Sequence, residues 1–156
     1  MGSPYNRLPK RIDTNGSTSH RPPVQLTDNL HMGSIYLALD GDDIGSQLEF
    51  HLLHEDIEGL REFARSFNSV LESIVHKLRR NPEISILLLG GDTLLAEMPA
   101  THIAATIDLI QSETARTDFT FSGGYGPSLR HAYLALRIAK ASGKNRICAL
   151  PSDIPL

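Results

Sequence analysis

The stretch "EISILLLGGDTLLAEMP", Glu83 to Pro99, carries the strongest signal for a fold in this chain. Two apolar runs of strand length flank Gly90 and Gly91, and paired glycines between such runs are typical of a tight β-hairpin. Asp92 follows the glycines, so it lies where the second strand of the hairpin begins. The segments before and after the hairpin decide which strand it pairs with.

A long amphipathic helix precedes the hairpin. From Glu58 to about Arg80, apolar residues recur in steps of three and four, which gives one stripe facing a core, and Asn81-Pro82 ends it. Residues 46–57 are expected to form a short helix or an irregular connection. They link this helix to the short apolar strand "SIYLAL", which ends at Asp40.

A second alternation of helices and strands follows the hairpin. "ATHIAATIDLIQSETA" is expected to be a helix and "DFTFSGGYG" a strand stopped by its glycines. "PSLRHAYLALRIAKASG" is expected to be a third helix, with Pro127 at its start and Gly143 just past its end. "RICAL" is a last short strand.

This order of elements, β-α-β-β-α-β and then α-β, predicts an α+β fold of the ferredoxin-like type. We expect an antiparallel sheet with helices packed on one face. The folded domain is expected over residues 35–150, with a short tail at 151–156. Residues 1–34 are too polar to offset their ordering entropy, so a disordered leader is expected. Within it, "HMGS" resembles a cloning junction, so part of the leader is expected to be vector-derived.

Composition excludes several classes of function. The chain has 156 residues and a net charge of −3 at pH 7, which gives no reason to expect binding to DNA or to an acidic membrane. Its single cysteine allows no internal disulfide, which suits a reducing compartment. No run approaches the roughly 18 apolar residues that a membrane span needs. A soluble, cytoplasmic protein is therefore expected.

Two distant acids are predicted to meet at one edge of the sheet. In a ferredoxin-like sheet the first strand lies beside the third, so Asp40 and Asp92 should be neighbours. Carboxylates brought together need a counter-charge, and a divalent cation such as Mg²⁺ supplies one. The carbonyl of Gly41 offers a further oxygen ligand. Gly91 would let the backbone approach a nucleotide closely.

The third predicted helix runs back to the same edge and brings cations with it. Arg137, Lys140, Lys144 and Arg146 lie at or just beyond its C-terminal end. A nucleoside triphosphate is the natural anion to place between these cations and a metal bound by the acids. Phosphoryl transfer needs mainly in-line positioning and neutralised charge, and two metals could activate a hydroxyl and stabilise leaving pyrophosphate.

Four segments together resemble a known family: "YLALDGDDIG", "LLLGGDTLLAEMP", "FTFSGGYG" and "AYLALRIAKASGKNRI". Their order and spacing are similar to those of a GGDEF-type palm domain. More closely, they resemble the minimal CRISPR polymerase (mCpol) family, relatives of the palm of type III CRISPR effectors. The resemblance covers about residues 35–150.

This resemblance implies a nucleotidyltransferase that joins two nucleoside triphosphates into a cyclic dinucleotide and releases pyrophosphate. It implies Mg²⁺ or Mn²⁺ as cofactor and a homodimer that brings two half-sites together. For mCpol relatives it implies anti-phage defence, with ATP favoured over GTP and cyclic di-AMP as product. A downstream effector that senses the cyclic nucleotide is the implied indirect partner.

The resemblance also implies roles for single residues. Asp40 is similar to the first metal ligand of the family, with the Gly41 carbonyl beside it. Asp92 is similar to the acid that bridges both metals, so Asp40 and Asp92 are the implied catalytic pair. The implied substrate-binding residues are Lys140 and Lys144 for the triphosphate and Asn68 for the base. Arg137, Gly91 and Asp43 are further candidate substrate-binding residues that the resemblance does not itself assign.

One position departs from the family pattern. Thr93 stands where the family carries a second acid after the paired glycines. This change implies weaker metal binding, proton transfer left to metal-bound hydroxide or water, or an attenuated enzyme.

Less specific interpretations fit the same residues. Asp40, Asp42 and Asp43 could form a polar loop that caps the next helix, and Asp92 could be a turn residue. Basic residues near a helix C-terminus oppose its macrodipole without any ligand. Two functional alternatives also remain: a nucleotide hydrolase resembling archaeal GTP cyclohydrolase III, and a degenerate palm that binds a nucleotide or serves as a scaffold.

Overall fold

The computed structural model of this chain describes residues 33–150. The predicted order of elements is confirmed, and the connection after the first strand is a helix. The elements are β1 (Ser34–Gly41), α1 (Ile44–Leu53), α2 (Ile57–Arg79), β2 (Ser85–Gly90), β3 (Thr93–Pro99), the 3-10 turn η1 (Ala100–His102), α3 (Ile103–Thr114), β4 (Phe121–Gly126), α4 (Leu129–Ala141) and β5 (Ile147–Ala149).

The ends of the predicted domain fall at the limits of the described residues. β1 begins at Ser34, one residue inside the leader predicted for residues 1–34. The rest of that leader, up to residue 32, and the predicted tail at 151–156 lie outside the described residues. Within residues 33–150, no helix is long and apolar enough to cross a membrane.

The five strands form one sheet in the order β2-β3-β1-β4-β5. β1 pairs antiparallel with β3 and with β4, so the first strand lies beside the third as predicted. β5 pairs with β4 in the parallel direction, so the sheet is mixed and the prediction of an antiparallel sheet is wrong at this edge. The reason is α4, which carries the chain back along the sheet, as a helical crossover between parallel strands does.

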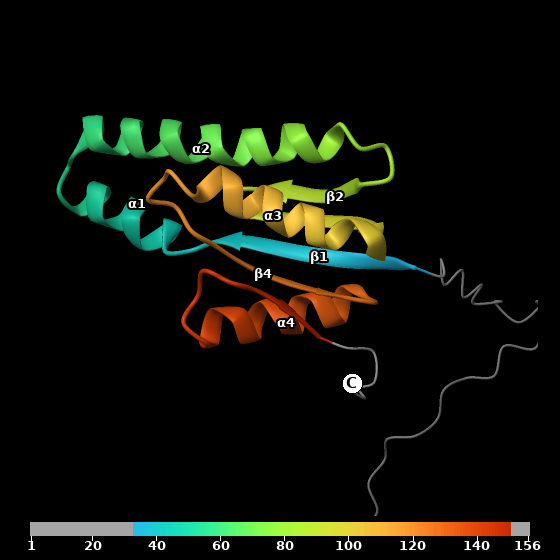
Figure 1. The fold of residues 1–156 in the computed structure, drawn as a ribbon. Coiled ribbons are helices and arrows are strands. Elements are labelled where there is room, and N and C mark those ends of the chain that lie inside the picture. The colour runs from blue at the N-terminus through green and yellow to red at the C-terminus, as the bar shows by residue number, and fades with distance from the viewer. Residues whose placement is uncertain (1–32, 151–156) are drawn as a thin grey trace, which may run out of the picture.

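Helices cover both faces of the sheet (Figure 1). Side chains alternate along β1: Leu37 and Leu39 pack into the main core with α2 and α3, whereas Ala38 packs against Ala132 and Leu136 of α4. The prediction that helices pack on one face is therefore wrong for α4. β1 lies in the middle of the sheet and is buried on both faces, which explains its continuous apolar run.

Small residues allow α4 to pack closely on β4. A Cβ added at Gly124 would lie 2.0 Å from the backbone nitrogen of Leu136, so only glycine fits there. Ala132, Ala135 and Ala139 on the facing side of α4 have no exposed surface. This close packing fixes the C-terminal end of α4 against the edge of the sheet where β1 ends.

The long helix α2 follows the predicted stripe. Asp56 caps its start by accepting a hydrogen bond from the Gly59 backbone N–H at 3.0 Å, and basic residues occupy its last turn. Its buried residues are all members of the predicted stripe: Phe67, Leu71, Ile74, Val75 and Leu78.

Candidate active site

The two predicted acids meet where β1 ends and β3 begins. Asp40 pairs in register with Thr93, and the backbone N–H of Gly41 donates a hydrogen bond of 3.0 Å to the carbonyl oxygen of Asp92. The prediction that Asp40 and Asp92 are neighbours at one sheet edge is therefore confirmed for the backbone.

The side chains of these two acids leave the edge on different faces of the sheet. Asp40 faces α4, because its carboxylate contacts Lys140. A Cβ built on Gly41 would point toward α2, 3.1 Å from the Cβ of Asp92 and 3.3 Å from the ring of Phe67. The Asp92 side chain therefore starts on the α2 face. The two side chains therefore start on opposite faces of the sheet at its end.

Thr93 contacts the first acid directly. Its hydroxyl donates a hydrogen bond of 2.7 Å to Oδ1 of Asp40. A carboxylate at position 93 would repel Asp40 at this register position, because like charges directly opposite each other destabilise a strand pair. Thr93 instead holds the carboxylate of Asp40 in one orientation.

Lys140 brings a positive charge to the end of β1. Its Nζ atom lies 2.9 Å from Oδ2 of Asp40, 2.7 Å from the carbonyl oxygen of Gly41 and 2.8 Å from Oδ1 of Asp42. Burial alone would lower the pKa of Lys140, but hydrogen bonds and charge from Asp42 and Asp40 outweigh it and raise that pKa. Lys140 therefore stays protonated at neutral pH and serves as the counter-ion of these acids.

Asp42 is the buried member of the ionic cluster formed by Asp40, Asp42 and Lys140, and its side chain is 2 % exposed. Burial alone would raise its pKa, but hydrogen bonds from Lys140, Ser122, the Asn145 N–H and Thr120 together lower it. The bonds from Ser122, Thr120 and Asn145 measure 2.7, 2.9 and 3.0 Å. Asp42 therefore joins β4, α4 and the loop after α4.

The local sequence around Asp42 predicts no more than a polar loop that caps the next helix. Its partners come from β4, α4 and the loop after α4, about 80 to 100 positions away, so no local spacing indicated this network. The excess of acids in "LDGDDIG" was the only local signal.

Asp43 and Lys144 form an ion pair on the surface beside this cluster. Asp43 occupies the N-cap position of α1 with φ of 60°, but its side chain makes no capping hydrogen bond. The capping interpretation is therefore wrong for Asp43. Lys144 follows the end of α4 in a left-handed conformation with φ of 62°, as does Asn145.

The predicted substrate-binding residues line three separate hollows. The first, which we call the α4 groove, has a volume of about 670 Å³ and contains Asp40, Thr93, Arg137, Lys140 and Lys144. Asp43 lines another hollow of about 430 Å³, between the start of α1 and residues Asp118 to Thr120.

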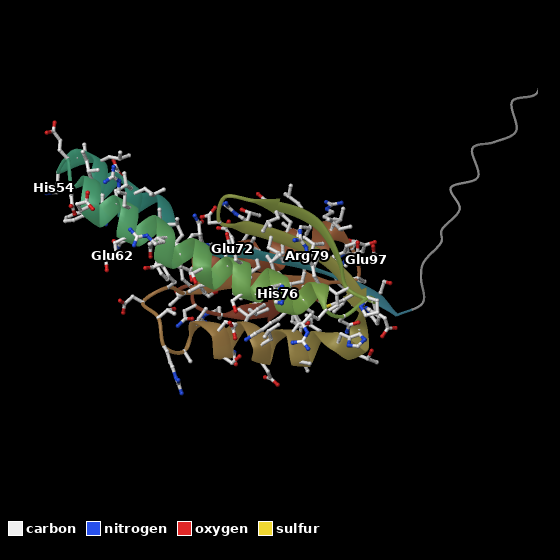
Figure 2. The ribbon with its side chains drawn as sticks, turned by 90° about the horizontal axis from the view of Figure 1, so that it is seen from above. His54, Glu62, Glu72, His76, Arg79 and Glu97 are labelled. Carbon is white, nitrogen blue, oxygen red and sulfur yellow. The ribbon has the colours of Figure 1, made fainter. Side chains whose placement is uncertain are left out.

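The remaining hollow, which we call the α2 hollow, lies between α2 and the turn of the hairpin and has a volume of about 750 Å³. Asn68 and Gly91 line it, so the structure separates these two predicted residues from the basic ones. Figure 2 shows three further residues of its wall, Glu72, His76 and Arg79, along α2.

The residues at the sheet edge fit a hard divalent cation. Within residues 33–150, no three His, Cys, Asp or Glu side chains cluster as a ready metal site. However, Oδ2 of Asp40 and the carbonyl oxygen of Gly41 already converge on one cation, the ammonium of Lys140. Mg²⁺ binds through one or two carboxylates and takes its other ligands from water and substrate phosphates. Asp40 and the Gly41 carbonyl could hold such an ion on the α4 face, and Asp92 would join them only by reaching around the end of the sheet.

This arrangement of strands, helices and edge acids is a palm fold of the GGDEF type. The GGDEF domain of DgcB from Caulobacter crescentus, crystallised in complex with c-di-GMP, is similar with a TM-score of 0.59 and 22% identity, over 75% of this chain and 78% of that one. The GGDEF domain of PA1120 (TpbB or YfiN) from Pseudomonas aeruginosa gives a TM-score of 0.60 and 16% identity, over 78% of this chain and 79% of that one.

The chain belongs to the minimal CRISPR polymerase (mCpol) domain family, whose model matches residues 36–150. It therefore has a palm domain of the nucleotide cyclase and polymerase type. The diguanylate cyclase SiaD from Pseudomonas aeruginosa, solved in complex with its activator SiaC, is also similar. The TM-score is 0.57 at 16% identity, over 79% of this chain and 52% of SiaD. No curated protein matches the chain.

Proposed function

We propose that this protein is a metal-dependent nucleotidyl cyclase that converts two ATP molecules into cyclic di-AMP and releases pyrophosphate. The observation that carries the proposal is the convergence of Asp40, the Gly41 carbonyl and Lys140 at the edge where Asp92 immediately precedes β3. The family adds support, because its palm domain is of the nucleotide cyclase and polymerase type. An edge that gathers oxygen ligands and cations suits phosphoryl transfer.

Asp40 and Asp92 are the proposed catalytic residues. With the Gly41 carbonyl they would hold Mg²⁺ or Mn²⁺, which would neutralise phosphate charge and favour ionisation of the attacking hydroxyl. Thr93 would keep Asp40 in a fixed orientation through its hydrogen bond. In this proposal Thr93 supports the metal ligand and does not bind the metal.

Lys140 has two proposed roles, one in the free protein and one with substrate. In the free protein its ammonium neutralises Asp40 and Asp42. A triphosphate at the edge would share this ammonium, and Lys144 and Arg137 lie in the same groove to meet further phosphate oxygens. Asn68, Gly91 and Asp43 are proposed to contact substrate from the neighbouring hollows.

We further propose a homodimer in the cytoplasm that acts in anti-phage defence. Each copy would supply one half-site, because one edge cluster can orient only one nucleotide for attack on the other. The product would reach a downstream effector that senses cyclic nucleotides. No DNA or membrane contact is part of this proposal.

Product analysis tests the proposed function. The protein is incubated with each nucleoside triphosphate and Mg²⁺ or Mn²⁺, and products are identified by mass spectrometry. A cyclic dinucleotide with pyrophosphate is expected, with ATP used in preference to GTP. A ring-opened base would indicate a hydrolase instead. A second alternative is a degenerate palm that binds a nucleotide or serves as a scaffold, and Thr93 in place of an acid favours it. Nucleotide binding without any turnover would support this alternative.

A further inference from the structure

The outer edge of the sheet at β2 is apolar and open. Within residues 33–150, β2 pairs only with β3, so no strand lies on its other side. Three consecutive residues of β2, Leu87, Leu88 and Leu89, are each between 43 and 53 % exposed. Edge strands usually carry charges or proline, and Ser85–Gly90 contains neither. A run of three exposed apolar residues is expected where another surface covers it.

The leucines of this edge lie on both faces of the sheet. Leu88 lines the α4 groove, and Leu89 lines the α2 hollow on the opposite face. Leu87 has no partner on β3, because the strand pairing shifts between Ile86 and Leu88. Such a bulge bends a strand. A contact at this edge would therefore rest on leucine side chains from both faces more than on a regular ladder of hydrogen bonds.

The helix α2 adds two opposite charges along the same edge. Ser73 and Lys77 mark the side of α2 that faces α3, because both bind Glu113. Glu72 and Arg79 lie on the other flank, where they line the α2 hollow beside the hairpin (Figure 2). Both are exposed, and neither has an ion-pair partner within residues 33–150. The edge thus offers one negative and one positive charge to a second molecule.

These two charges are placed for a contact with two-fold symmetry. Glu72 and Arg79 are two helical turns apart, which is about 10 Å along α2. β2 begins near the C-terminal end of α2 and ends beside Asn68. The centre of β2 therefore lies beside the helical turns between Glu72 and Arg79. In a two-fold contact about this centre, Glu72 of each copy meets Arg79 of the other.

We propose that the β2 edge, formed by Leu87, Leu88, Leu89, Glu72 and Arg79, binds the β2 edge of a second copy of this chain about a two-fold axis. The leucines pack against their counterparts, and two equivalent ion pairs flank them.

This contact does not rest on the proposed function. The two copies run antiparallel at the contact, so their hairpin turns lie at opposite ends of the paired edges. The candidate active sites lie next to these turns and are therefore kept apart. The pairing of half-sites in the proposed function would use a different surface.

Sedimentation velocity of the full chain tests the contact, in the presence of EDTA and without nucleotide. The unchanged protein is expected to be a dimer. Glu72→Arg and Arg79→Glu each bring like charges together at both ion pairs, so each should raise the Kd of the dimer at least about tenfold. Leu88→Lys should have the same effect, because it places a charge in the apolar centre. Circular dichroism checks that each variant is folded.

An equimolar mixture of the Glu72→Arg and Arg79→Glu chains gives the sharpest test. In a mixed pair every contact again joins an arginine to a glutamate, so a heterodimer should form about as tightly as the unchanged dimer. Native mass spectrometry identifies it, because the two chains differ in mass. The double variant Glu72→Arg/Arg79→Glu restores both ion pairs and should also dimerise. Glu62→Arg makes the same change on the part of α2 outside the α2 hollow, and it should leave the dimer unchanged.

Several outcomes would overturn the inference. A monomer at every soluble concentration would leave the edge to another occupant, such as residues 1–32 of this chain or a different protein. Failure of the single reversals to weaken the dimer, or of the mixture to form a heterodimer, would place the contact elsewhere. A dimer seen only with nucleotide and metal would be the half-site pairing of the proposed function. A heterodimer without any cyclic dinucleotide product would support this inference and refute the proposed function.

Discussion

The hydroxyl of Thr93 donates a hydrogen bond of 2.7 Å to Oδ1 of Asp40 across the paired strands β3 and β1. The other oxygen of the same carboxylate contacts Lys140 at 2.9 Å. Asp40 is therefore held from two sides, by a neutral donor and by a cation. The residue that departs from the family pattern thus has a role in positioning the first acid.

Thr93→Val should lower turnover by roughly 10- to 100-fold, because a hydrogen bond to a charged group contributes about 1.5–3 kcal/mol. The methyl groups of valine keep the shape and β propensity of the strand, so the melting temperature should change little. Thr93→Ser retains the donor and is the control. Equal activity of the valine and serine variants would show that orientation of Asp40 by this hydroxyl does not matter.

Asp40→Asn and Asp92→Ala should each reduce metal-dependent turnover by at least a thousandfold while the protein stays folded. Each change removes a negative oxygen ligand that a hard divalent cation requires. Formation of pyrophosphate is the measurement, and removal of metal with EDTA should give the same loss in the unchanged protein. Full activity in either variant would exclude that residue from the metal site.

Lys140→Ala should weaken triphosphate binding and also destabilise the fold. Removing the ammonium leaves the buried carboxylate of Asp42 without its charged partner, which costs about 3 kcal/mol. Lys144→Ala should weaken binding without this cost, because its ion pair with Asp43 is exposed. Calorimetric affinity and thermal unfolding separate the two effects. Unchanged affinity in Lys140→Ala would leave that lysine only a structural role.

The stability of the protein should fall steeply in acid because of Asp42. Its pKa is lowered in the folded state, so its contribution is present above the unfolded value of about 3.9 and is lost as pH falls through the folded pKa. Lys140 affects stability at alkaline pH instead. Its pKa is raised in the folded state, so its contribution to stability is lost only at pH above about 10.4.

Urea unfolding from pH 2 to 7 measures this dependence. Asp42→Asn should be destabilised at neutral pH and should show a shallower slope below pH 4, because the amide no longer titrates. If the variant kept the same slope as the unchanged protein, other carboxylates would cause the acid sensitivity.

Gly124→Ala should destabilise the protein by about 3 kcal/mol or more, because the new Cβ would lie 2.0 Å from the Leu136 nitrogen and would push α4 off the sheet. Gly45→Ala provides the matched control. Gly45 lies within α1, nothing stands within 4 Å of its added Cβ, and alanine there should stabilise the helix by about 0.5–1 kcal/mol. Similar unfolding free energies for the two variants would contradict the close packing of α4.

Much of the fold could be predicted from local patterns. Three signals are local in sequence: the apolar stripe of α2, the paired glycines of the hairpin and the glycine after α4. At such positions periodicity and backbone conformation decide the structure. The side of the sheet that α4 covers could not be predicted in this way. That choice depends on the contact of Gly124 with Leu136, which the strand and the helix make only together.

Some features of the candidate site likewise follow from the sequence, and others follow only from the tertiary structure. The sequence alone determined the order of the elements, and through it the meeting of Asp40 with the start of β3, because strand order follows from the connections. Only the tertiary structure decided which face each side chain takes, that Lys140 binds Asp40, Gly41 and Asp42 at once, and that Asp42 is buried. These contacts join residues about a hundred positions apart, and their energies depend on distance and burial in space, which no local sequence pattern encodes.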